Sequence, residues 1–160
     1  MIKDLEFFFK NIIFSQKFLL KRRLVRAIKK NYEKELSMIN KFSDKSKSAV
    51  DVGVYRGVYS YKLSKKFKHV YAYEPNPLIF PYLEKNLKKI ISNLTIKNYA
   101  LSNNSGIADL RIPTRSNSFF KNNIEELYRL GCATIHNKND FENYRIKKVK
   151  KMCLDQDLNN

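Results

Sequence analysis

A short apolar run ending in glycine restricts the possible fold of this chain more strongly than any other segment. It reads Ala49-Val50-Asp51-Val52-Gly53. Strands buried on both faces of a parallel sheet have near-continuous apolar sequences, and glycine permits the tight turn that must follow them. The run therefore predicts a buried parallel strand with a turn at its carboxyl end.

The segments that follow alternate between helical and strand patterns. Residues 57–67 are typical of a helix, and residues 69–73 of a second strand that Glu74-Pro75 ends. Asn76 is a favourable N-cap and Pro77 a favourable first residue for a helix to about residue 91, before a third strand over residues 94–101. The order strand, helix, strand, helix, strand predicts the βαβαβ half of a doubly wound, Rossmann-like α/β fold.

The pattern is weaker beyond this half. Residues 103–106 read as a turn, and alternating apolar residues at 108, 110 and 112 predict a strand that completes a β-hairpin. Residues 124–130 suggest a short helix and residues 144–154 a weak strand.

Residues 1–47 predict a basic helical segment. Apolar side chains with helical spacing run from Leu5 to Ile13 and again from Leu20 to Ile28, and charged residues interrupt them too often for a membrane span or a signal peptide. Such a face can cover a sheet or another helix, which we favour, or residues 1–30 can contact an anionic membrane surface. A polar linker over residues 43–48 separates this segment from a domain over residues 48–160.

Basic side chains exceed acidic ones by 32 to 15, for a formal net charge of +17. The excess declines gradually along the chain and forms no single cluster. Because Lys, Asn and Ile are enriched together, as an A/T-rich coding sequence would produce, we expect no specific nucleic-acid partner. Two cysteines without zinc-site spacing favour a reduced, cytoplasmic chain with no metal.

Asp51, Gly53 and Gly57 lie at the turn after the first strand, and Glu74 lies at the end of the second. Ligands of open α/β sheets bind at the carboxyl ends of the strands, where a carboxylate can accept hydrogen bonds from ribose hydroxyls. Dinucleotides require glycine where this turn has Val54 and Tyr55. S-adenosylmethionine carries no phosphate and has a cationic sulfonium, so it fits better, and Tyr59 is placed to touch it. A tight turn and a solvated Glu74 with no ligand remain the alternative.

Several ordered segments resemble blocks of the FkbM-type S-adenosylmethionine-dependent methyltransferases. They are residues 49–53, 57–60, 73–77, 98–102 and 105–113, with residues 33–36 and Leu154-Asp155 in the same order. The resemblance implies that Asp51, Gly53 and Gly57 form the methionine side of the cofactor site, that Glu74 binds the ribose, and that Asn76, Ala100 and Leu101 flank the adenine. Val54 and Tyr55 replace the family's Ala-Asn within that site.

By the same resemblance, the reaction is O-methylation of a sugar, a glycan or another small-molecule hydroxyl. No catalytic residue is assigned, because neither His69 nor His136 has a carboxylate partner at a recognisable spacing.

The family continues into a fourth strand with an Asp-Val-Glu-Gly motif, whereas this chain ends at Asn160. We therefore expect a C-terminally truncated domain in which residues 49–52 form an exposed sheet edge, open to a complementing chain or a second copy. The alternative function is an inactive chain whose basic helical arm binds an anionic membrane surface, nucleic acid or a partner chain.

Overall fold

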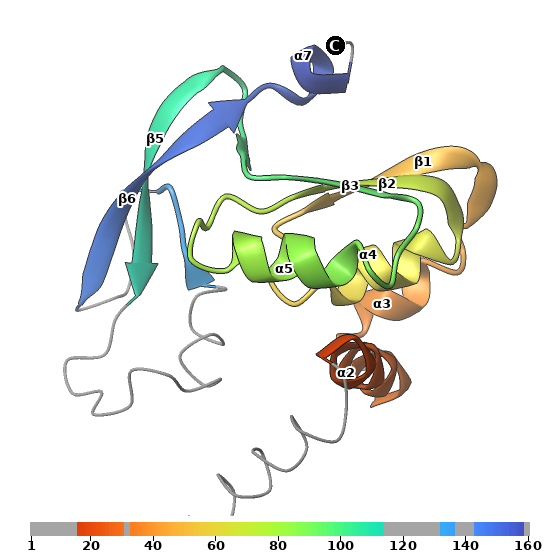
Figure 1. Cartoon of the computed structure of the whole chain (residues 1–160). Coiled ribbons are helices and arrows are strands. Elements are labelled where there is room, and N and C mark those ends of the chain that lie inside the picture. Colours follow the sequence, from red (N-terminus) through yellow and green to blue (C-terminus); the bar gives the residue numbers. More distant parts are fainter. Residues whose placement is uncertain (1–15, 31–32, 114–131, 137–142, 159–160) are drawn as a thin grey trace, which may run out of the picture.

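The computed structural model describes residues 16–30, 33–113, 132–136 and 143–158. It is a mixed α/β structure with two three-stranded sheets, ordered β1-β2-β3 and β4-β6-β5. Figure 1 shows the first sheet with helices beneath it and the second sheet to its left. This arrangement is compatible with the Rossmann-like α/β class expected from the sequence.

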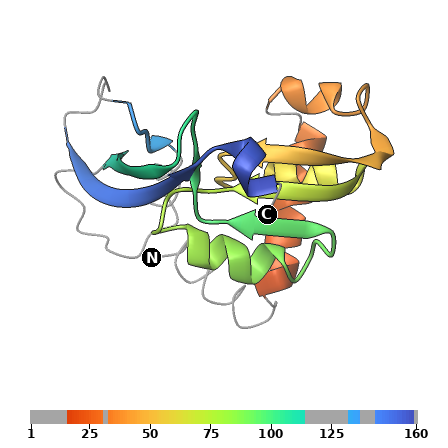
Figure 2. The same cartoon turned by 90° about the horizontal axis from the view of Figure 1, so that it is seen from above.

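The first sheet is parallel and forms as the apolar runs predict. Its strands are β1 (Asp44–Val52), β2 (Phe67–Tyr73) and β3 (Leu94–Lys97), connected by α4 (Val58–Ser64) and α5 (Phe80–Leu87). Within the described residues β1 has β2 as its only neighbour in the sheet, so the predicted exposed edge at residues 49–52 is confirmed. Figure 2 shows the three strands from above.

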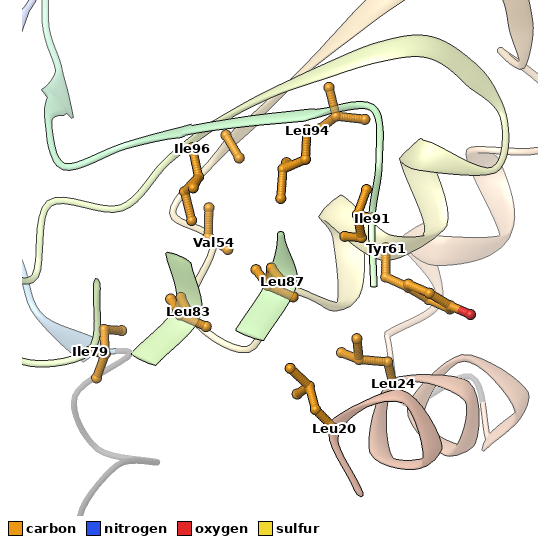
Figure 3. Close-up of a cluster of buried hydrophobic side chains, with 12 residues drawn as sticks. Leu20, Leu24, Val54, Tyr61, Ile79, Leu83, Leu87, Ile91, Leu94 and Ile96 are labelled. Carbon is orange, nitrogen blue, oxygen red and sulfur yellow. The ribbon is translucent and has the colours of Figure 1, made fainter. Parts of the chain in front are cut away.

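The principal core lies between this sheet and the helices on one of its faces. Val70 and Ala72 of β2 and Leu94 and Ile96 of β3 point toward Leu87 of α5, and all are buried. α2 (Gln16–Lys30) contributes its apolar side to the same cluster, as Figure 3 shows for Leu20 and Leu24. The interpretation that this helix covers another part of the protein is therefore confirmed over residues 16–30.

The N-terminal region differs from its prediction at the linker. Residues 43–48 were expected to be an irregular linker, but β1 begins at Asp44 and pairs there with Phe67, with a register irregularity before Ser48. Backbone pairing with β2 overrides the polar side chains, because strand hydrogen bonds do not require apolar residues. The expected helical segments around Leu5–Ile13 and residues 124–130 lie outside the described residues, and α3 (Glu35–Met38) is a single short turn.

The helix after β2 also begins later than expected. Residues 77–79 form a turn in which the buried Asn76 Oδ1 accepts a hydrogen bond of 3.0 Å from the Leu78 N–H. The Asn76 carbonyl accepts from Ile79 and Phe80, where α5 starts. α5 therefore starts three residues later than predicted, but Asn76 still caps the turn that leads into it, because its side-chain oxygen accepts the Leu78 N–H and its carbonyl accepts the Phe80 N–H.

The third strand forms but is shorter than predicted, and the predicted β-hairpin is wrong. Residues 94–101 divide into β3 in the first sheet and β4 (Ala100–Leu101) in the second, and β5 (Gly106–Pro113) pairs with β6 (Tyr144–Met152). β6 lies between β4 and β5, running parallel to the first and antiparallel to the second. β5 has eight residues to pair and β4 has two, so the distant strand satisfies far more backbone than a hairpin could.

The second sheet has its own small core of Ala100, Leu110, Ile112 and Val149. After β6 the chain enters α7 (Leu154–Leu158), which lies above the first sheet, opposite α4 and α5 (Figure 1). Among the described residues, no helix combines the length and apolar character needed to cross a bilayer.

Candidate functional site

The turn after β1 folds over the carboxyl end of β2. The Gly53 and Val54 N–H groups both donate to the Tyr73 carbonyl, at 2.8 and 3.3 Å, and the Gly57 N–H closes the turn on the Val54 carbonyl at 2.7 Å. Gly53 and Gly57 have φ values of 81° and 76°, which only glycine adopts readily. The glycines that the sequence singled out are therefore required by the backbone at this turn.

Glu74 meets this turn directly. Its Oε2 accepts a hydrogen bond of 2.8 Å from the Tyr55 N–H, and its Oε1 accepts one of 2.8 Å from the Asn76 N–H. The residue is only 5% exposed. Burial raises the pKa of Glu74 and the charge of Asp51 adds to this effect, while the two backbone hydrogen bonds oppose it. Glu74 and the glycine turn are therefore in direct contact.

Neighbouring strands hold Glu74 in place. Its N–H donates to the Lys97 carbonyl at 3.0 Å, and the Asn98 side-chain amide donates to its carbonyl at 2.6 Å. Both partners come from the end of β3. The carboxyl ends of β2 and β3 are therefore fixed together immediately beside the turn.

Asp51 lies on the helix-facing side of β1 and is buried. Its carboxylate accepts a hydrogen bond from the Ser60 hydroxyl on α4. Burial raises the pKa of Asp51, and the hydrogen bonds from Ser60 only partly offset this. The Asp51 carboxylate thus joins β1 to α4 behind the glycine turn.

Acidic side chains gather at this turn in a protein that is otherwise strongly basic. Burial is the main cause that raises the pKa of Tyr59 to about 12. A hydrogen bond with the Glu33 side chain adds to the effect, as do the negative charges of Glu33, Glu35 and Asp51. Asp51 in turn interacts electrostatically with Glu74. Three carboxylates thus act on Tyr59, and the Arg56 guanidinium also lies in this turn, 5.0 Å from the centre of the Tyr55 ring.

Two of the expected site residues lie in the second sheet, shortly after Asn98, whose side-chain amide binds the Glu74 carbonyl. Ala100 and Leu101 belong to β4, and Ala100 packs with Leu110 and Val149 in the core of the second sheet. Val54, by contrast, is buried in the first core, and Tyr55 packs against it with a φ of 48°. The turn residues, Tyr59, Glu74 and Asn76 therefore belong to the first sheet's site, while the expected adenine-flanking segment belongs to the second sheet.

Sequence reasoning missed the connection between α7 and this site. Asp157 is buried and its Oδ2 accepts hydrogen bonds from Tyr73 Oη at 2.6 Å and from Lys97 Nζ at 2.7 Å. Tyr73 and Lys97 are the residues whose carbonyls hold Gly53 and Glu74. Burial disfavours the Asp157 carboxylate, but the Lys97 and Tyr73 hydrogen bonds outweigh burial and lower its pKa. No local pattern identifies a partner 84 residues away.

His69 contacts the neighbouring strand, where its Nε2 lies 2.9 Å from Thr95 Oγ1 on β3. Groups of three or more metal-ligating side chains do not occur within the described ranges.

Replacement of Asp51 by Asn tests the electrostatic description. Burial raises the pKa of Asp51 in the folded protein above its value in the unfolded chain. Between these two pKa values the folded protein binds more protons than the unfolded chain, so its free energy of unfolding decreases as the pH rises through this range. Asp51→Asn removes this loss and keeps an oxygen for Ser60. We expect its urea midpoint, measured by circular dichroism, to exceed that of the unchanged protein more at pH 7 than at pH 4. An equal difference at both pH values would contradict the assignment.

A scan against protein-family models finds no match, and searches of curated proteins and of solved structures find none either, so the site is interpreted from its own geometry.

Proposed function

We propose that this site binds S-adenosylmethionine and that the chain is a Rossmann-like methyltransferase domain of the FkbM type. The proposed reaction is methylation of a hydroxyl group on a sugar or another small molecule. The observation that carries the proposal is the hydrogen bond between the Tyr55 N–H and Glu74 Oε2, 2.8 Å long. Through this hydrogen bond, the carboxylate that we propose to bind the ribose lies next to the turn that we propose to bind the methionine end of the cofactor.

The hydrogen-bond acceptors and the charges at this site suit this cofactor. Each Glu74 oxygen accepts one backbone N–H, and a carboxylate oxygen has two lone pairs, so one acceptor position per oxygen remains for the ribose hydroxyls. A Cβ placed on Gly53 would meet no heavy atom within 4 Å, so there is open space beside the turn. The acidic surroundings of Asp51 and Glu74 favour the sulfonium and ammonium charges of the cofactor.

Cofactor entry requires movement of the turn. Glu74 is 5% exposed and the Tyr55 amide lies against one of its oxygens. We infer that ligand binding shifts the turn enough for ribose hydroxyls to reach the remaining acceptor positions of the Glu74 carboxylate. The left-handed conformation of Tyr55 costs about 1–3 kcal/mol, so the strained residue is the one that would change conformation.

The bound cofactor would supply an electrophilic methyl group, to which the acceptor oxygen would bond as the carbon–sulfur bond breaks, while the hydroxyl proton would pass to solvent water. The chain's contribution is to bind, orient and exclude water. Tyr59 is protonated at neutral pH, as an ordinary tyrosine is, and its raised pKa of about 12 makes it an even weaker acid, so it can donate a hydrogen bond. Cys132 and Cys153 are free thiols, which suits the cytoplasmic location that we propose.

Direct titration tests the proposed function. We expect isothermal titration calorimetry of the folded chain to give saturable binding of S-adenosylmethionine. Its demethylated product should bind about tenfold or more weakly, because that product lacks the sulfonium charge near Asp51 and Glu74. NAD is the matched control, since it shares the adenosine ribose but needs a glycine where Val54 and Tyr55 stand. Absence of heat with S-adenosylmethionine, or equally tight binding of NAD, would refute the proposal.

A further inference from the structure

The strands β5 and β6 form a two-stranded ribbon with one face that the second core does not use. The register places Ile107 opposite Lys150 and Arg111 opposite Ile146. Directly opposed residues point to the same side of an antiparallel pair. Because Ala108, Leu110 and Val149 occupy the alternate positions and form the core, Ile107 and Ile146 lie on the opposite side, which we call the outer face of the ribbon.

Apolar side chains are strongly exposed on this outer face. Ile107, Ile146 and Tyr144 are 62%, 50% and 42% exposed. Single exposed apolar residues are common, but these three share one side of two adjacent strands. Tyr144 and Ile146 are successive outward residues of β6, and Ile107 lies on β5 beyond the Asp109–Lys148 ion pair. Removal of this apolar surface from water would therefore stabilise a bound state.

Cations accompany these apolar side chains. β6 reads Tyr-Arg-Ile-Lys-Lys-Val-Lys-Lys-Met, with no acidic residue. Of its basic residues, the register places Lys148 and Lys150 on the outer face. On the outer face, the Lys150 ammonium lies 4.7 Å from the centre of the Tyr99 ring and the Arg111 guanidinium 5.8 Å from that of Tyr144. Asp109 is the only acidic residue on either strand, and it pairs with Lys148 at 3.1 Å. The outer face is therefore both apolar and positively charged.

We propose that the outer face of the ribbon docks on an anionic lipid bilayer. Lysines beside an anionic surface are attracted to the lipid headgroups, and apolar side chains next to them enter the boundary of the hydrocarbon region. A nucleic-acid partner would use the cations and Tyr144 but would leave Ile107 and Ile146 in water, because aliphatic side chains do not stack on bases as aromatic ones do. The exposed isoleucines therefore favour lipid. This proposal is independent of the cofactor site.

Vesicle sedimentation of the full chain tests the docking surface. Vesicles of phosphatidylcholine with about 30 mol% phosphatidylserine should bind the protein, and vesicles of phosphatidylcholine alone should not. Two double variants probe the two components: Ile107→Ser with Ile146→Ser, and Lys148→Gln with Lys150→Gln. Each should lower the partition coefficient about tenfold or more, since each removes two side chains that contact the bilayer.

The control removes the same charge elsewhere. Lys85→Gln with Lys89→Gln changes two exposed lysines near α5 and should alter the partition coefficient less than about twofold. Circular dichroism verifies that every variant is folded. The substitutions are confined to exposed side chains, so retention of the fold is expected.

Three results would overturn the proposal. The first is no sedimentation with anionic vesicles. The second is vesicle binding that the double serine variant leaves unchanged, together with binding of a single-stranded RNA oligonucleotide that the double glutamine variant of Lys148 and Lys150 weakens. This combination would identify nucleic acid as the partner. The third is binding that depends equally on Lys85 and Lys89, which would show a nonspecific attraction of the net positive charge.

Discussion

The Gly57→Ala variant is expected to lose about 2–4 kcal/mol of unfolding free energy. Two costs combine at this position. The φ of 76° is strained for any residue with a Cβ, and that Cβ would lie 2.7 and 2.8 Å from the two Cδ atoms of Leu87. Leu87 is 0% exposed and packed in the principal core, so it has no free space into which to move. Urea unfolding followed by circular dichroism measures the loss.

Gly53→Ala is the matched control. Gly53 has a similar φ of 81°, but an added Cβ there would meet no heavy atom within 4 Å. Only the backbone cost remains, so we expect a loss of about 1 kcal/mol. Adding Leu87→Val to Gly57→Ala should recover part of the larger loss, because the shorter side chain relieves the contact. Equal losses in the two glycine variants would show that contact with Leu87 is unimportant.

The Glu74→Gln variant is expected to weaken S-adenosylmethionine binding by about tenfold to a hundredfold. Gln keeps the length of the side chain but removes the negative charge and replaces one acceptor oxygen with an amide donor. That donor would face the N–H of Tyr55 or Asn76, each now 2.8 Å from a carboxylate oxygen. Both the electrostatic attraction of the ligand and one ribose hydrogen bond would be lost. Calorimetric titration measures the change.

Glu84→Gln is the control for this change. Glu84 lies on α5 and pairs with Lys88 at 2.7 Å on the protein surface. Because exposed ion pairs contribute little and this one lies outside the proposed site, the affinity should remain within about twofold. If Glu84→Gln weakened binding as much as Glu74→Gln, the effect would reflect net charge, and Glu74 would not be the ribose ligand.

The sequence allowed the first sheet and most of the site to be predicted. The run from Ala49 to Gly53 became the end of β1 and its turn, and Glu74 lies against that turn at the end of β2. These features are local, because a buried strand needs consecutive apolar residues and a reversal with positive φ needs glycine. The helical spacing of Leu20 and Leu24 likewise predicted that one side of α2 packs against another part of the protein, and both side chains lie in the principal core.

The second sheet and the support of the site could not be predicted in this way. Asp157 reaches Tyr73 and Lys97 from α7, and neither the spacing nor the residue type signals this contact. Similarly, the burial of Glu74 depends on how the turn at Tyr55 folds back. Hydrogen bonds between distant segments depend on which surfaces meet after folding, so they leave no periodic pattern in the chain.

By itself, the sequence determined the order of the helices and strands around the first sheet and the positions of the residues at its carboxyl edge. Only the tertiary structure decided that β5 pairs with the distant β6, that Ala100 and Leu101 enter a separate sheet, and that Ile107 and Ile146 share an exposed face with Lys150. The physical reason is that local patterns specify which segments can be strands, whereas strand partners are selected by competition for backbone hydrogen bonds and buried area across the whole chain.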